Sequence, residues 1–201
     1  MDLELQKIDQ SMISFMKKDL SLVELVRSID KNRIELNKRF DEDKTYGFDL
    51  PLTDYLEVVK RMLSSQKYGP RIQNKVADIM GYESIHAKNK KGDFLTPSNK
   101  FLEFKVSYYY KGSYSFLQIR PWDKFGHIFL IIYPDYSYTI FFLTPEQIKY
   151  ELEKIGEVCH GNTDLKSIRL YPHSKKNAHH FERWIKNYKM DDFSDLIGII
   201  K

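Results

Sequence analysis

The sequence has few of the features that mark secreted or membrane proteins. Its 201 residues include one cysteine, Cys159, which excludes an intrachain disulfide and fits a reducing cytoplasm. The first ten residues lack the apolar stretch of a signal peptide, and the longest apolar run, at residues 128–133, is far too short to span a membrane. We therefore expect a cytoplasmic protein that makes no use of a membrane.

The sequence does contain enough apolar residues for a core, and its charges are unevenly distributed. Hydrophobic residues make up 42% of the chain, and the net charge is +4. Residues 1–63 hold 11 Lys/Arg and 13 Asp/Glu, whereas residues 86–125 hold 8 and 3, and residues 166–189 hold 7 and 1. Two basic segments that follow an acidic N-terminal segment favour a polyanionic partner such as nucleic acid. Lysines that are simply solvated at the surface would give the same counts.

The periodicity of apolar residues predicts helices, then a run of strands, then helices again. Helical spacing covers the first forty residues, and Thr53 is expected to cap a third helix. Gly69-Pro70 is expected to open a fourth helix, and Thr144-Pro145 a fifth. The predicted strands are residues 93–95, 101–110, 115–120, 128–133 and 138–143, the later helices are residues 146–155 and 178–188, and residues 159–174 are a loop or short strand.

This order of elements indicates an α+β fold with a central mixed β-sheet flanked by helices. We expect residues 1–201 to form one domain. Within it, residues 1–50 would form a helical N-terminal extension, and residues 53–189 would form the core and the C-terminal helix.

One group of residues has the composition of a catalytic site: Asp93, followed after nine residues by Glu103-Phe104-Lys105. Side chains alternate along a strand, so Glu103 and Lys105 share a face while Phe104 points the other way. A turn at Pro97 would fold Asp93 back beside Glu103. The same acid–any–Lys pattern occurs at residues 42–44 and 164–166, but in polar turns without a paired strand.

Two carboxylates brought together in this way repel each other unless a cation lies between them. Mg²⁺ suits such an oxygen site, because it takes one or two carboxylates, and the Phe104 carbonyl would supply another oxygen. The ion would acidify an attacking water, and Lys105 would orient that water and offset negative charge on a scissile phosphate. From spacing alone, an ordinary solvated strand face explains the same three side chains.

These residues resemble the PD-(D/E)XK nucleases, and more narrowly the small type II restriction endonucleases. The likeness rests on Gly92-Asp93, on Glu103-Phe104-Lys105 and on the segment SQKYGPRIQN at residues 65–74, with weaker similarity at residues 116–122 and 159–162. It covers roughly residues 60–165. Gly92 stands where the family often has proline, and Gln73 stands where its preceding helix often carries a glutamate.

The resemblance implies a three-layer α/β/α core, Mg²⁺ held by Asp93 and Glu103, and cleavage of double-stranded DNA at a specific sequence. It also implies a homodimer that cuts a short symmetric site, a companion DNA methyltransferase, and a prokaryotic or viral cytoplasm. Two rivals stay open. One is a repair, junction or mobile-element nuclease with the same core, and the other is a DNA-binding protein that does no chemistry.

Further residues are expected to support the site or to hold DNA. Gln118 and Arg120 alternate with apolar neighbours and would share a face, and His160 would line the cleft; an ordinary polar face and a surface loop explain them equally well. Gln73 is the remaining candidate for active-site support. The lysines and arginine expected to contact DNA phosphates are Lys67, Arg71, Lys88, Lys90, Lys91, Lys111, Lys175 and Lys176.

Overall fold

The computed structural model describes residues 50–63, 65–85, 92–120, 124–159 and 167–200, together with scattered helical residues between 23 and 34. The rest of the predicted N-terminal extension lies outside the described residues. The chain divides into two compact units, Met1–Lys75 and Val76–Lys201. In the described part of the chain, no helix combines the length and the apolar character needed to cross a membrane.

The first unit contains helix α3 (Leu52–Met62) and most of helix α4 (Ser65–Met80). Both helix starts differ from the prediction. Pro51, not Thr53, occupies the N-cap position of α3, and no side chain caps it. Pro70 lies inside α4 rather than at its start. The helix continues through Pro70 because the preceding residue is Gly69, which has no Cβ to clash with the proline ring.

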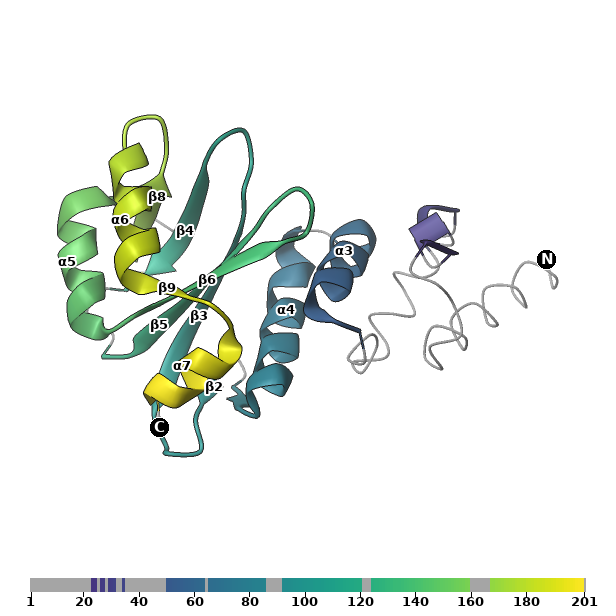
Figure 1. Cartoon of the computed structure of the whole chain (residues 1–201), viewed down its shortest axis with the longest axis horizontal. Coiled ribbons are helices and arrows are strands. Elements are labelled where there is room, and N and C mark those ends of the chain that lie inside the picture. The colour runs from purple at the N-terminus through teal and green to yellow at the C-terminus, as the bar shows by residue number, and fades with distance from the viewer. Residues whose placement is uncertain are drawn as a thin grey trace. The chain divides into compact units, whose positions relative to one another are not determined.

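The second unit is built on a mixed six-stranded sheet (Figure 1) with the order β1-β2-β3-β5-β6-β9. Strand β3 runs parallel to β5, and every other neighbouring pair is antiparallel. The mixed sheet expected for an α+β fold is therefore present. Its strands are β1 (Glu83–Ser84), β2 (Phe94–Leu95), β3 (Phe101–Tyr108), β5 (Gly126–Ile132), β6 (Tyr138–Leu143) and β9 (Lys189–Met190).

Strand β5 lies in the middle of this sheet, and all seven of its residues are buried. A strand covered on both faces needs apolar side chains on both, which explains its nearly continuous apolar sequence. Residues paired in register point to the same face. Glu103 pairs with His127 and Lys105 with Phe129, so these four side chains share one face of the sheet.

A second sheet of three strands packs beside the first, with the order β4-β8-β7. Its strands are β4 (Tyr114–Ile119), β8 (Ser167–His173) and β7 (Gly156–Cys159). The sequence predicted the strand now called β4, but as part of the central sheet. By leaving that sheet after the β3–β4 hairpin, β4 lets β5 pair directly with β3.

Helices α5 (Pro145–Ile155) and α6 (Ala178–Tyr188) cover the face that carries Phe129 and Ile131 (Figure 1). The predicted start of α5 is confirmed, because Thr144 and Gln147 form a capping box. The two helices are joined by buried Glu151, which accepts hydrogen bonds from Arg183, Trp184 and Tyr188. Helix α7 (Phe193–Ile200), which the sequence did not predict, follows β9.

Candidate active site

The hairpin formed by β2 and β3 positions the Asp93 carboxylate. The Asp93 N–H donates to the Leu102 carbonyl at 2.7 Å, and the Asp93 carbonyl accepts from the Ile85 N–H at 2.8 Å. The Asp93 side chain then reaches across to β3, where its Oδ2 accepts a 2.8 Å hydrogen bond from the Phe104 N–H. The main chain on both sides of Asp93 and its carboxylate are therefore fixed to neighbouring strands.

Glu103 and Lys105 lie on the same face of β3, as the alternation of side chains predicts. The Lys105 ammonium donates to Glu103 Oε1 at 2.5 Å, and only 9% of the Glu103 side chain and 17% of the Lys105 side chain are exposed. Phe104 faces the other way and packs on Phe94, with ring centroids 5.4 Å apart. The three predicted catalytic residues are thus brought into one local arrangement.

The electrostatics of this arrangement favour a positive charge between the two carboxylates. Burial, and next the Glu103 carboxylate, raise the pKa of Asp93 to about 6; the Lys105 ammonium, the Phe104 N–H and the Arg120 guanidinium oppose that rise. Two carboxylates and a backbone carbonyl form a donor set that suits Mg²⁺, which keeps several waters and rarely has an all-protein cage. Among the described residues, no group of three or more His, Cys, Asp or Glu side chains is arranged to hold a metal. A cation here would therefore rely on these two carboxylates, with the Phe104 carbonyl as the expected third oxygen.

His127 belongs to the same site, and sequence reasoning missed it. It is fully buried, lies beside Glu103 in register on β5, and is the one polar side chain in that strand. Burial lowers its pKa to about 4, Glu103 opposes that shift, and Lys105 adds to it. A lone histidine inside an otherwise apolar central strand is the sequence signal that would have found it.

Arg120 and Gln118, which the sequence placed on one face, differ in their exposure. Half-buried Arg120 lies close enough to lower the pKa of Asp93, whereas Gln118 is exposed. The register of β4 shifts between Phe116 and Ile119, and Gln118 has a φ of 56°. This β-bulge breaks the alternation, because Leu117 becomes exposed while Ile119 is buried. The expected alternation therefore fails at Leu117, which is exposed beside exposed Gln118.

The remaining predicted site residues are on other elements of the chain or outside the described residues. Gln73 and two of the expected phosphate contacts, Lys67 and Arg71, are on α4 in the first unit. Lys111 lies in the exposed β3–β4 turn, with its Nζ 5.2 Å from the centroid of the Tyr110 ring. Lys175 and Lys176 are exposed in the turn before α6. Lys88, Lys90, Lys91 and His160 lie outside the described residues.

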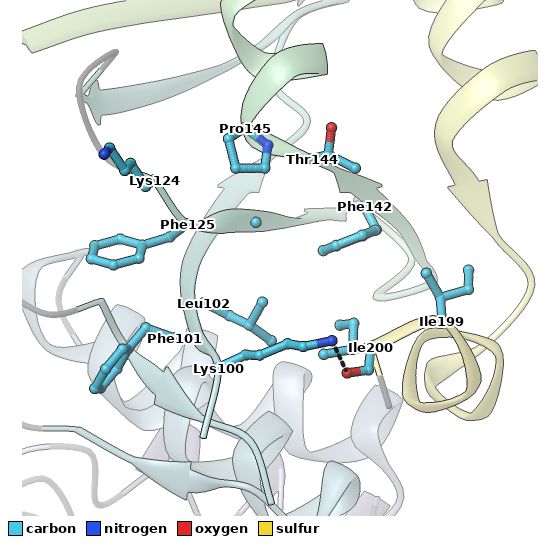
Figure 2. Close-up of a pocket in the computed structure, with 11 residues that line it drawn as sticks. Lys100, Phe101, Leu102, Lys124, Phe125, Phe142, Thr144, Pro145, Ile199 and Ile200 are labelled. Atoms are coloured by element: carbon cyan, nitrogen blue, oxygen red, sulfur yellow. Dashed lines mark hydrogen bonds between the residues drawn. The ribbon is translucent and has the colours of Figure 1, made fainter. Parts of the chain in front are cut away.

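A cavity of about 440 Å³ near the start of β3 and β5 is a poor alternative for the site (Figure 2). Leu102 and Phe142 reach it from the face opposite Glu103, and Ile199 and Ile200 of α7 close another side. Lys100 on its edge donates to the Ile200 carbonyl at 3.3 Å. Its described lining carries no carboxylate or imidazole, so it has no group to activate water.

No protein-family model matches this sequence, and no curated protein matches it.

Gly92 is expected to be essential for the position of Asp93. Its φ is +91°, and a Cβ there would lie 2.7 Å from the Leu102 carbonyl oxygen, the same atom that accepts from the Asp93 N–H. We expect Gly92→Ala to lower the free energy of unfolding by more than the roughly 1–2 kcal/mol that a left-handed backbone alone costs. Urea denaturation measures this change.

Gly112 provides the matched control for that substitution. Its φ is +80°, but nothing lies within 4 Å of the Cβ that alanine would add. Gly112→Ala should therefore cost only the backbone term. Equal losses for the two alanine variants would show that the close approach of Gly92 to β3 does not matter.

The charge of Asp93 should make stability depend on pH. The folded carboxyl keeps its proton up to a pKa of about 6, above its ordinary 3.8, so its stabilising contribution is complete below 3.8 and is lost as pH rises through 6. Asp93→Asn removes that charge and keeps an oxygen for the Phe104 N–H. We expect the variant to be more stable than the parent at pH 7.5, by at most about 3 kcal/mol, and equally stable below pH 4.

Thermal unfolding at a series of pH values, with EDTA present, measures that difference. Mg²⁺ should reduce the stability difference between Asp93→Asn and the parent at pH 7.5, because it stabilises the parent through a carboxylate that the variant lacks. A stability difference between Asp93→Asn and the parent that is the same at pH 3.5 and pH 7.5 would contradict the claim that ionised Asp93 destabilises the fold.

Proposed function

We propose that this chain is a Mg²⁺-dependent endonuclease that hydrolyses phosphodiester bonds of double-stranded DNA. The observation that carries the proposal is the joint placement of Asp93, Glu103 and Lys105. Asp93 is bonded to the backbone between the other two residues, and the Lys105 ammonium contacts Glu103. A buried acid with a second acid and an amine half-buried beside it is costly unless the three groups serve a ligand or a reaction.

Each residue has a role that follows from its chemistry. Asp93 and Glu103 would hold the cation, and the Phe104 carbonyl would add a neutral oxygen. When bound, Mg²⁺ supplies Lewis acidity and lowers the pKa of water. Lys105 would donate hydrogen bonds to the attacking water and to the scissile phosphate, and its positive charge would offset the charge that develops there. No covalent enzyme intermediate is needed.

The charge near the site also suits a phosphate. Lys105 and Arg120 place two positive groups beside the two carboxylates. Lys111, Lys175 and Lys176 are exposed on turns of the same unit and would contact the DNA backbone. Phosphate contacts fix the orientation of a protein on DNA, whereas contacts with base edges select the sequence.

The finer part of the proposal rests on the resemblance to small type II restriction endonucleases. The order of helix α4 followed by the β2–β3 hairpin supports a restriction-endonuclease-like core. This finer part of the proposal is that a homodimer cleaves a short symmetric DNA sequence in a prokaryotic or viral cytoplasm. It also includes a companion methyltransferase that protects the host DNA.

Substitution of each acid and of the amine tests the proposal. We expect Asp93→Asn, Glu103→Gln and Lys105→Ala each to lower the cleavage rate by about 100-fold or more. The two carboxylate variants should still bind DNA, because they remove no positive charge. Glu153→Gln, which changes an exposed carboxylate on α5, is the matched control and should cut like the parent.

The measurement is digestion of unmethylated phage DNA by the purified full chain, with Mg²⁺ or with EDTA. Discrete bands that require Mg²⁺ support the restriction endonuclease. A smear, or cleavage of flaps and junctions without cleavage of plain duplex, selects the repair or mobile-element nuclease. DNA binding with no cleavage of any substrate selects the non-catalytic protein. Full activity in Glu103→Gln would overturn the assignment of the site.

A further inference from the structure

His127 is a buried imidazole with one nitrogen committed and the other without a partner. Its Nδ1 lies 2.9 Å from the Phe125 carbonyl oxygen. Its Nε2 is buried and forms no hydrogen bond with any residue that the structure describes. A polar atom buried in this way costs stability unless it finds a partner, so native proteins rarely keep one without a use.

The contact with Phe125 determines what Nε2 can do. A carbonyl oxygen only accepts, so Nδ1 must carry the proton and donate it. A protonated ring would bury a second, charged N–H that has no acceptor among the described residues, so this setting favours the neutral ring. A neutral imidazole protonated at Nδ1 has a lone pair on Nε2. Nε2 is therefore a fixed hydrogen-bond acceptor and needs a donor.

The position of the ring indicates which donor is available. His127 pairs in register with Glu103, and its ring stacks on Phe129 with centroids 5.8 Å apart. Phe129 is in turn the register partner of Lys105. The imidazole thus lies on the shared face beside both members of the Glu103–Lys105 pair. Glu103 has only acceptor oxygens when ionised, whereas the Lys105 ammonium, which interacts electrostatically with the ring, has three N–H groups to donate.

We propose that His127 is a positioning residue for Lys105: its Nε2 accepts a hydrogen bond from the Lys105 ammonium when the Glu103 carboxylate binds a divalent cation. This inference rests on the proposed function. In the structure, Lys105 is held by Glu103. Once Glu103 engages a cation, its attraction for Lys105 weakens and the two positive charges repel. The neutral acceptor on β5 keeps the ammonium within the site, where it can act on the phosphate.

Nitrogen NMR of the full chain tests this exchange directly, without any measurement of activity. The parent and Lys105→Met are compared, each selectively labelled with ¹⁵N-histidine, before and after addition of MgCl₂. We expect the Nε2 resonance of His127 to move on Mg²⁺ addition in the direction of an accepted hydrogen bond, and to stay unmoved in Lys105→Met. An Nε2 resonance that is unchanged in the parent at saturating Mg²⁺, or that moves equally in both proteins, overturns the proposal.

Three substitutions of His127 separate the role of Nε2 from a packing role. Phe keeps the ring and removes both nitrogens. Asn keeps a donor for the Phe125 carbonyl but has no atom at the position of Nε2. Gln places an oxygen or nitrogen there. We expect Phe and Asn to lower kcat 10- to 100-fold with little change in the KM for DNA, and Gln to recover part of the loss.

Thermal unfolding distinguishes these losses from misfolding. His127→Phe removes an unsatisfied buried atom but also the hydrogen bond to the Phe125 carbonyl, two effects of opposite sign, so its Tm should stay close to that of the parent. A fall in kcat with an undiminished Tm supports the positioning role. Parent-like kcat in both Phe and Asn, or a kcat loss that Asn recovers better than Gln, overturns it.

Failure of this inference and failure of the proposed function give different results. If the parent protein neither binds Mg²⁺ nor cuts DNA, the proposed function is contradicted. If the parent protein binds Mg²⁺ and cuts DNA, and His127→Phe cuts equally well, the role of His127 is contradicted and the proposed function stands.

Discussion

The hydrogen bond from the Phe104 N–H to Asp93 Oδ2 is the contact on which the candidate site depends. It fixes a carboxylate from outside the strand onto the backbone between Glu103 and Lys105. The close approach of Gly92 to Leu102 makes that geometry accessible. The same contact brings a second acid near Glu103 in a buried setting, so the arrangement that defines the site also strains it. A cation between the two carboxylates relieves that strain.

The fold supports this strained site by surrounding it with rigid elements. Strand β5 is buried on both faces and holds β3 by parallel pairing along its whole length. Strand β4 leaves the main sheet for the second sheet, and Arg120 directly follows β4 near Asp93. Among the residues that the structure describes, two acids and two bases therefore meet where two sheets adjoin, and these four charges nearly cancel before any substrate arrives. Phosphate and a divalent cation add opposite charges to that balance.

Much of this arrangement could be predicted from the sequence, because it depends on local rules. Alternation places Glu103 and Lys105 on one face, and the Thr144 capping box begins α5 where the sequence predicts. Long-range pairing decided the rest. The β-bulge in β4 exposes Leu117, which alternation would have buried, and no periodicity could assign β4 to a second sheet. Helix α7 was missed, although the Asp192 carboxylate caps it through the Ser194 and Asp195 N–H groups. The place of His127 beside Glu103 could not be predicted, because it depends on the register between β3 and β5.

Anomalous diffraction from crystals of the full chain soaked in MnCl₂ tests the central claim most directly. Mn²⁺ takes the oxygen ligands that suit Mg²⁺ and can be located without ambiguity by its own scattering. We expect an anomalous peak between the carboxylates of Asp93 and Glu103, and its loss in a crystal of Glu103→Gln. Saturating Mn²⁺ with no peak at that place, and with Lys105 still paired to Glu103, would contradict it.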